Sequence, residues 1–198
     1  VVNITALGLV AKQNLRLRSQ AKSGDLLFVT GPLGGSRAGL ELILHADIAR
    51  EEWHQPLLNC HLQPTPCLAE AKRLNDIFGQ SLHSLNDISD GLASECAEIA
   101  AASGVKIIIK SAKIPISQET QKLVSLRQAS SLEWALFGGE DYQLVGTIAA
   151  EKADELTEIY AQTGKKLWII GHVTEGSGVW LDDEKNCQMI TQKGYAYF

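Results

Sequence analysis

The chain has 198 residues, of which 45% are hydrophobic, so it can form one large domain or two small ones with a sizeable core. Its formal charge is −5 and it has no long run of lysine or arginine, which argues against nucleic acid as the main partner. No stretch of 18 apolar residues is present, so the sequence predicts no membrane partner.

Residues 1–10 alternate like a strand, with Val2, Ile4 and Ala6 on one face. No basic region precedes this apolar stretch, so it does not resemble a signal peptide. The chain opens inside this strand without a methionine. We therefore expect residues 1–10 to be a strand left over from a preceding domain and residues 11–198 to form one domain.

Strands and helices alternate over the rest of the chain. Short apolar or β-branched runs predict strands within 25–32, 81–89, 105–110, 138–148, 166–173 and 178–183. Apolar residues at helical spacing predict helices within 33–46, 64–78, 91–104, 117–128, 130–137 and 150–164. We expect Ser117 to cap one helix and Gly104 to end another. The pattern predicts an α/β (α+β) fold, a mixed β-sheet covered by helices, with part of the sheet antiparallel.

The four cysteines are sparse and form no CxxC pair, which favours reduced thiols in a cytoplasmic protein. A zinc site built from Cys60, His61 and Cys67, with His54 upstream, is the alternative. Its spacing fits no common zinc pattern, and two prolines interrupt it. We therefore expect small apolar thiols and surface histidines.

Two aspartates stand in the stretch Leu85–Leu92, LNDISDGL, at the expected junction of a strand and a helix. Ligands of α/β sheets bind at such junctions, and free amides at a helix N-terminus favour phosphate. Two carboxylates repel phosphate unless a divalent metal joins them, so Asp87 and Asp90 are candidate Mg²⁺ ligands. The alternative is a helix cap, in which Asp90 or Ser89 accepts from first-turn amides; this leaves Asp87 unexplained.

A second dense cluster is Phe137–Leu144, FGGEDYQL. Its paired glycines permit positive φ or close approach of a ligand. Glu140 and Asp141 are suited to a metal, a substrate amine or a cationic ring; the alternative is an ordinary polar turn. A third stretch, TGPLGGSRAGLE at 30–41, suggests a phosphate cradle ahead of a helix. It lacks the lysine and the spacing of a P-loop.

These stretches coincide, in order, with one known family. DISDGLASE, FGGEDYQL and the final KGYAYF resemble thiamine-monophosphate kinase, as do TALG, LRSQAKSGDLLFVTG, LGGSRAGLEL and HLQPTPCLAEA. The likeness covers nearly the whole chain. Aminoimidazole-ribotide synthetase and selenophosphate synthetase share the general plan but usually not both the DISDGL and GGEDY strings. The resemblance implies the fold of the C-terminal domain of the aminoimidazole-ribotide synthetase-like superfamily.

The resemblance implies that ATP transfers its γ-phosphoryl group to thiamine monophosphate, giving thiamine diphosphate and ADP. The attacking oxygen belongs to a phosphate whose second pKa is about 6, so it is largely deprotonated at pH 7. No strong general base or covalent nucleophile is then required. Catalysis becomes alignment of two polyanions and neutralisation of their charge, which calls for carboxylates that hold several Mg²⁺ ions.

The resemblance also implies roles at six matching positions: Asp87 and Asp90 as metal ligands, Arg18 and Ser89 as ATP-binding residues, and Glu140 and Tyr195 as substrate-binding residues. Tyr195 matches an aromatic residue that stacks on thiamine, and a cationic thiazolium on an aromatic face is a favourable contact. The family usually has glutamate where this chain has Gln143, which we expect to be a neighbour of the site rather than a ligand.

The family also has an N-terminal domain that supplies further metal-binding aspartates and most of the dimer interface. One of those aspartates stands in a Gly-Asp-Thr segment shortly before the position of Val1. The resemblance therefore implies that this chain is a C-terminal part, that the parent is a homodimer, and that the part alone lacks kinase activity. Two alternatives remain: another ATP-dependent synthetase of the superfamily, or a non-catalytic nucleotide-binding module whose acids serve as caps and turns.

Overall fold

The computed structural model describes residues 2–45, 47–162 and 164–191. Its strands form one sheet: β1 (Leu26–Val29), β2 (Leu82–Asp87), β3 (Lys106–Lys110), β4 (Leu144–Ile148), β5 (Trp168–Thr174), β6 (Gly178–Asp182) and β7 (Cys187–Met189). Across the sheet the order is β2-β4-β1-β5-β3-β6-β7. All neighbouring strands are antiparallel except β3 and β6, which are parallel. The predicted mixed sheet is therefore confirmed.

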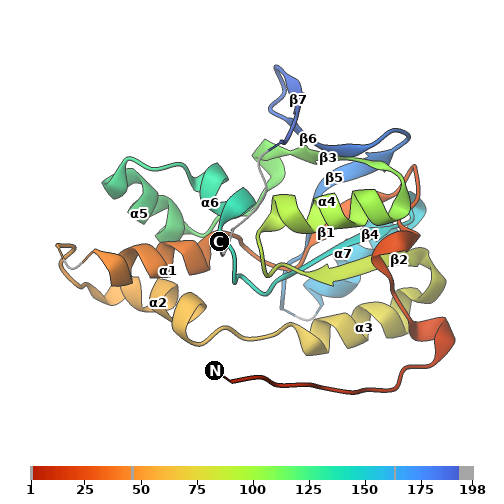
Figure 1. The fold of residues 1–198 in the computed structure, drawn as a ribbon, viewed down its shortest axis with the longest axis horizontal. Helices are drawn as coiled ribbons and strands as arrows, with labels where there is room; N and C mark the ends of the chain where they lie inside the picture. The colour runs from red at the N-terminus through yellow and green to blue at the C-terminus, as the bar shows by residue number, and fades with distance from the viewer. Residues whose placement is uncertain (1, 46, 163, 192–198) are drawn as a thin grey trace.

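The described residues form seven α-helices (Figure 1): α1 (Gly35–Leu44), α2 (Gln55–Leu62), α3 (Leu68–Phe78), α4 (Leu92–Ser103), α5 (Gln118–Arg127), α6 (Ser131–Phe137) and α7 (Ala153–Ala161). Alternate residues of β1 face opposite sides, as the period of a strand requires. Leu27 and Val29 pack with α4 and α6, whereas Phe28 packs with α3 and α7. Helices therefore cover both faces of the sheet.

The remaining helices form a group beyond the end of β1. A third apolar cluster holds α1, α2, α5 and α6 together through Ala38, Leu42, Leu57, Leu123 and Trp134. The strands β1 and β2 both end, and β4 begins, at this end of the sheet. The chain therefore places its glycine-rich turns and the acids of the LNDISDGL stretch between the sheet and the helical group.

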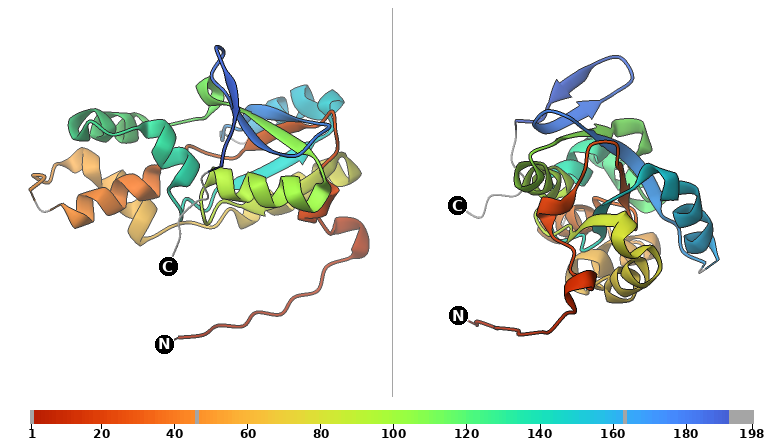
Figure 2. Two further views of the ribbon diagram at one scale, coloured as in Figure 1. Left: turned by 45° about the horizontal axis from the view of Figure 1, so that its top comes forward. Right: turned by 90° about the vertical axis from the view of Figure 1, so that its right-hand side faces the viewer.

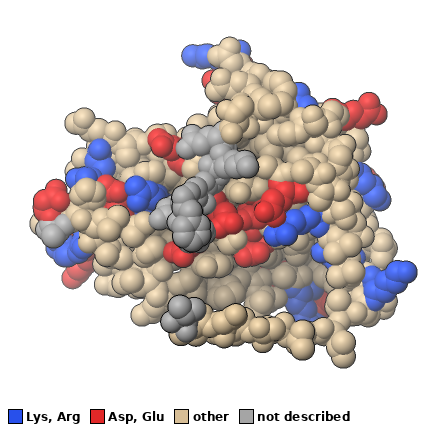
Figure 3. All heavy atoms as spheres, in the orientation of Figure 1, with Lys and Arg blue, Asp and Glu red and all other residues tan. Residues whose placement is uncertain are grey.

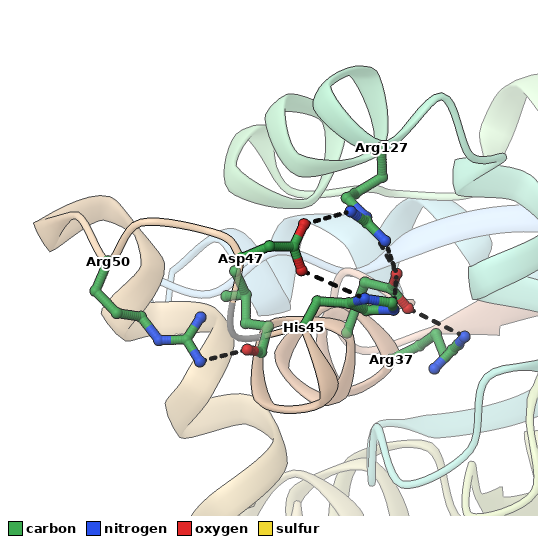
Figure 4. Close-up of polar contacts among 7 residues, drawn as sticks. Arg37, His45, Asp47, Arg50 and Arg127 are labelled. Carbon is green, nitrogen blue, oxygen red and sulfur yellow. Dashed lines mark hydrogen bonds and ion pairs between the residues drawn. The ribbon is translucent and has the colours of Figure 1, made fainter.

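A charged network fastens α1 to α5. The carboxylate of Glu41, which is buried, lies 3.3 Å from Arg37 Nη2, 3.0 Å from His45 Nε2 and 3.2 Å from Arg127 Nη2. Figure 4 shows Arg37, His45 and Arg127 around one carboxylate, with Asp47 beside His45 and Arg127. The Asp47 side chain is 70% exposed, and its carboxylate lies 3.5 Å from Arg127 Nη1. The three basic groups offset the loss of hydration of the Glu41 carboxylate.

Several expected local features are present. Helix α4 buries Leu92, Cys96 and Ile99 on one face and ends at Gly104, which has a φ of 66°. The side chain of Ser117 caps α5 by accepting a hydrogen bond of 3.1 Å from the Thr120 amide. The apolar spacing and the caps therefore predicted these helix boundaries correctly.

Other segments differ from the expectations or are not tested by the structure. Residues 2–10 run as an exposed, extended segment along the outside of the molecule (Figures 1 and 2), and the expectation that they are a strand of a preceding domain stays a prediction. A strand needs a partner for its backbone groups, and the described part of the chain offers this segment none. The helix expected within 64–78 begins only at Leu68. Helix α2 was not expected, since its short sequence carries only a weak apolar period.

Within the described residues, none of the helices has the length and apolar character needed to cross a membrane. The four cysteines are all unpaired.

Candidate functional site

The LNDISDGL and FGGEDYQL stretches lie side by side. The Ile88 amide donates to Gln143 O at 2.7 Å, the Tyr142 amide donates to Ile88 O at 2.9 Å, and the Glu140 amide donates to Ser89 O at 2.7 Å. These bonds continue the pairing of β2 with β4 beyond the regular sheet. Two stretches about fifty residues apart in the chain therefore build one site.

Glycine is required where the two stretches meet. A Cβ atom at Gly139 would lie 2.6 Å from Ser89 O, and one at Gly91 would lie 2.8 Å from Leu136 O. Gly91 also has a φ of 99°, a conformation that other residues rarely adopt. Glu140 and Tyr142 have positive φ values as well, 65° and 49°. The backbone here is therefore held in an unfavourable shape by its contacts, as is common at functional sites.

The two aspartates of the first stretch are open to solvent. Asp87 is the last residue of β2 and is exposed, and Asp90 is partly exposed just before α4. Among the described residues, neither carboxylate takes part in a hydrogen bond or an ion pair. The N-cap of α4 is Gly91, and no side chain caps this helix. The alternative in which Asp90 or Ser89 caps it is therefore wrong.

Three carboxylates act together on one tyrosine. Burial raises the pKa of the Tyr142 hydroxyl, and the negative charges of Glu140, Asp87 and Asp90 raise it further. Figure 3 shows acidic side chains gathered near the N-terminal half of α4. The structure thus brings together the two predicted metal ligands and the predicted substrate-binding glutamate on one open face.

A buried glutamate that was not predicted from the sequence holds the LNDISDGL stretch through hydrogen bonds. Glu95, in α4, accepts hydrogen bonds from the Asp90 amide (3.1 Å) and from Ser89 Oγ (3.2 Å), and another from Asn86 Nδ2. Burial raises the pKa of this carboxyl, and the charges of Glu98 and Asp87 add to that effect. The final letter of DISDGLASE was the available signal, but a helical glutamate alone is not distinctive.

Arg18 lies beside α4, next to Glu95 and Glu98. Its Nε atom is 3.0 Å from Glu98, and its Nη2 atom is 4.0 Å from Glu95. The arginine side chain is 48% exposed, so part of the guanidinium faces solvent. Of the predicted ATP-binding pair, Arg18 is thus accessible, while the Ser89 hydroxyl donates to Glu95.

The predicted phosphate cradle is occupied by a protein carboxylate. Asp141 accepts hydrogen bonds from the Gly34 amide (2.7 Å) and the Ser36 amide (3.1 Å) at the start of α1. Burial raises the pKa of Asp141 to about 6, although these amide bonds oppose the rise. The interpretation of residues 30–41 as a phosphate cradle is therefore wrong, because Asp141 takes the amides that a phosphate would need.

Glu140 has an unexpected neighbour. His61 Nδ1 lies 3.5 Å from Glu140 Oε2 and 2.9 Å from Ser36 Oγ. No signal in the sequence indicated this contact, because it depends on α2, which was not predicted. Tyr195, the sixth predicted site residue, lies outside the described residues.

A pocket of about 350 Å³ opens beside Asp87 and Tyr142. Apolar side chains, among them Leu68, Leu85 and Leu144, form much of its wall. Gln143 lies near this pocket but turns toward the sheet, where its Oε1 accepts a hydrogen bond of 3.2 Å from Thr30 Oγ1. The site therefore joins an acidic surface to an apolar hollow.

The described residues contain no group of three or more His, Cys, Asp or Glu side chains that could hold a metal ion. Asp87 and Asp90 nevertheless fit Mg²⁺, because that ion is usually held by one or two carboxylates together with water and substrate phosphates. Within the part of the chain that the structure describes, no hydrogen bond or ion pair competes for either carboxylate.

Known proteins that are similar to this chain belong to the family that its sequence motifs resemble. The family model described as "AIR synthase related protein, C-terminal domain" matches residues 22–183. The thiamine-monophosphate kinase of Bacillus subtilis is 38% identical over 202 residues, covering 100% of this chain and 60% of the relative. That of Aquifex aeolicus is 38% identical over 181 residues, covering 91% of this chain and 54% of the relative.

A solved structure described as AaThiL complexed with AMPPCP and TMP superimposes with a TM-score of 0.78 at 36% identity, covering 92% of this chain and 54% of that one. The chain thus spans little more than half the length of the relatives it matches, and it corresponds to their C-terminal part.

Proposed function

We propose that this chain, which belongs to the family described as "AIR synthase related protein, C-terminal domain", is the C-terminal part of a thiamine-monophosphate kinase, because its homologues are thiamine-monophosphate kinases. The reaction would transfer the γ-phosphoryl group of ATP to thiamine monophosphate. Below, "full-length enzyme" means this chain together with an N-terminal part like that of its relatives.

One observation carries the proposal. Asp87, Asp90 and Glu140 lie around Tyr142 on one open face, and the two aspartate carboxylates have no partner among the described residues. Repulsion among such carboxylates lowers stability unless they bind cations. A structural role would have provided hydrogen-bond or ion-pair partners. The arrangement therefore supports binding of metal-bound phosphates rather than a purely structural turn.

In this proposal, the acidic residues bind the metal ion and the basic residue binds a phosphate. Asp87 and Asp90 would hold Mg²⁺, which neutralises the phosphate charge when bound. Arg18 presents part of its guanidinium to solvent, where it can pair with a phosphate of ATP. Ser89 belongs to the same ATP-binding group, its hydroxyl fixed by Glu95.

Glu140 is placed to attract the cationic part of thiamine monophosphate, and Tyr195 would stack on that cation. An oxygen of the acceptor phosphate forms the new P–O bond, the bond from the γ-phosphorus to the bridging oxygen breaks, and ADP leaves. The acceptor oxygen is already deprotonated at pH 7, so no residue needs to remove a proton. The reaction therefore needs no general base from the protein.

The proposal extends to the setting of the enzyme. We infer a cytoplasmic location, which the sparse and unpaired cysteines favour. We also infer a homodimer that forms mainly through the N-terminal part. The chain alone should be inactive, because the N-terminal part would contribute further carboxylates. Turnover by purified residues 1–198, free of contaminating longer enzyme, would contradict this last point.

The deciding experiment is formation of thiamine diphosphate from ATP and thiamine monophosphate by the full-length enzyme, followed by chromatography. Transfer that requires Mg²⁺ is the expected result. A synthetase of the same superfamily would instead be protected against heat by aminoimidazole precursors and not by thiamine monophosphate. A non-catalytic module would show neither transfer nor Mg²⁺-dependent nucleotide binding.

A further inference from the structure

The imidazole of His61 lies beside the carboxylate of Glu140, with Nδ1 3.5 Å from Oε2. The His61 side chain is 19% exposed and that of Glu140 is 43% exposed, so the imidazole lies on the protected side of the carboxylate. Among the described residues, His61 is the one basic side chain within ion-pair distance of Glu140. The outer side of the carboxylate therefore remains open to a ligand.

Helix packing, rather than a loop, sets the position of His61. Helix α2 approaches α1 so closely that a Cβ atom at Gly39 would lie 2.2 Å from Leu57 O and 2.9 Å from His61 Cβ. Leu57 is itself fully buried in the cluster that joins these helices. Because well-packed helices resist displacement, the imidazole is a rigid support for its neighbour.

Ser36 connects this support to the turn that carries Glu140. Its amide donates to Asp141 Oδ1 at 3.1 Å, and its hydroxyl lies 2.9 Å from His61 Nδ1. Ser36 is buried, so both contacts are shielded from water. One residue of α1 thus holds the residue that follows Glu140 and the imidazole beside Glu140.

The proton on His61 decides what the carboxylate can do. A ring nitrogen carries at most one proton, so Nδ1 cannot donate to Ser36 and Glu140 at once. When Nδ1 carries the proton, the imidazole can donate to the Glu140 carboxylate, 3.5 Å away, and the charge of Glu140 stays available to a ligand on its open side.

Charged groups act on α2 at two places. Arg50, Lys122 and Glu51 act on His54 at its N-terminal end. Asp141 and Glu119 act on the Cys60 thiol, whose pKa is raised by burial and by those two charges.

We propose that His61 is a positioning residue, which holds Glu140 for the cationic half of the phosphate acceptor. The inference rests on the proposed function and adds a determinant of acceptor affinity to it. Without the imidazole, the Glu140 side chain can turn toward water, and the acceptor loses a fixed anionic partner. Binding of ATP, which takes place around Arg18 and the aspartates, is unaffected.

The test uses steady-state kinetics of the full-length enzyme. In His61→Ala and His61→Gln, the KM for thiamine monophosphate should rise about tenfold, as expected for a weakened charged contact. The KM for ATP and kcat should stay within about twofold of wild type. His61→Asn should keep a near-normal KM, because the asparagine amide occupies the place of Nδ1 whereas the glutamine amide does not. His172 is another half-buried histidine, in β5, so His172→Gln serves as the matched control for His61→Gln.

Unchanged KM values in both His61→Ala and His61→Gln would overturn the inference, as would equal rises in the KM values of both substrates. If His61→Ala does not fold, the contrast between the Gln and Asn variants decides. An inactive wild-type full-length enzyme would overturn the proposed function instead, and this inference with it. A second readout needs no activity: in the ¹⁵N-histidine-labelled chain, the Nδ1 resonance of His61 should shift in Ser36→Ala, and an unchanged resonance would also overturn the inference.

Discussion

Asp90 shows how one side chain separates a structural role from a chemical one. Helix α4 begins at Leu92 after its N-cap Gly91, without a side-chain cap, and the Asp90 amide, not its carboxylate, bonds to Glu95. Asp90→Asn should therefore leave the melting temperature of the full-length enzyme unchanged or slightly higher, since one acid is removed from a crowded group. Turnover should fall by roughly two orders of magnitude or more, because an amide is a poor Mg²⁺ ligand beside a triphosphate.

Thermal unfolding and turnover at several Mg²⁺ concentrations check this prediction together. Partial recovery at high Mg²⁺ would indicate a weakened site. Near-normal turnover of Asp90→Asn at ordinary Mg²⁺ would remove Asp90 from the metal ligands.

The buried carboxyl of Asp141 makes a prediction about pH. In the unfolded chain it releases its proton near pH 4, whereas in the folded chain it does so at about 6. Between these values the folded state holds more protons, so this group lowers the free energy of unfolding as pH rises from about 4 to 6. Relative to Asp141→Asn, the wild-type chain should lose up to roughly 3 kcal/mol across that interval.

Urea denaturation of both proteins at pH 4, 5, 6 and 7 measures the difference, in which the other titrating groups cancel. The difference should level off above pH 7. A difference that stays constant from pH 4 to 7 would show that burial does not perturb Asp141.

For single residues, the sequence predicted the exposed acids of the site but not the residues that contact and position them. Asp87 and Asp90 lie where a strand-to-helix junction predicts them, because local pattern sets that junction. Glu95 and His61 could not be predicted, since their roles come from contacts across α4 and α2 that no local pattern encodes. The phosphate cradle failed for the same reason: its amides bind Asp141, more than a hundred residues away.

Among the elements, α4 has a start that depends on a single glycine, Gly91. Gly91→Ala must place a Cβ atom 2.8 Å from Leu136 O at a φ of 99°, and neither backbone can move without disturbing the site. We expect a loss of about 2–4 kcal/mol in the free energy of unfolding. Gly104→Ala, at the other end of the helix, meets open space and should lose only about 1 kcal/mol. Urea titrations of the two variants give the comparison, and equal losses would contradict it.

The attachment of α1 to α5 can be tested through Glu41. Glu41→Gln leaves Arg37, His45 and Arg127 around a neutral amide and should lower the free energy of unfolding by about 1–3 kcal/mol. Asp47 also pairs with Arg127, but its side chain is 70% exposed. Asp47→Asn should therefore change the free energy of unfolding by less than about 1 kcal/mol. Equal effects of the two substitutions in calorimetry would mean that burial of Glu41 adds nothing.

For the elements, periodicity predicted the long, strongly patterned helices and most strands. For residues 2–10, whose alternation is that of a strand, the described part of the chain supplies no partner strand, so that prediction stays open. Periodicity missed α2, which has few apolar positions and owes its place to packing against α1. Local preference identifies an element only when the rest of the fold supplies a surface for it.

Taken as a whole, the molecule keeps its stability within the sheet and its helices. Val2, Ile4, Leu7 and Leu9 are at least 86% exposed, so a chain that begins at residue 11 should unfold within about 2 °C of the complete chain. Differential scanning calorimetry of the two chains measures this shift. A loss of more than about 5 °C would mean that the extended segment contacts the body in solution.

The central place of β1 bears on how the chain reaches its fold. Leu26 of β1 pairs with Ile148 on one side and with His172 on the other, so β1 has no partner until residues far downstream are available. Contacts of such long sequence separation slow folding, because the intervening loop must close before any pairing is gained. During synthesis, the first third of the chain would therefore leave the ribosome without a sheet to join. The LNDISDGL stretch would gain its counterpart only when β4 emerges, and the acidic face would be among the last parts of the molecule to take shape.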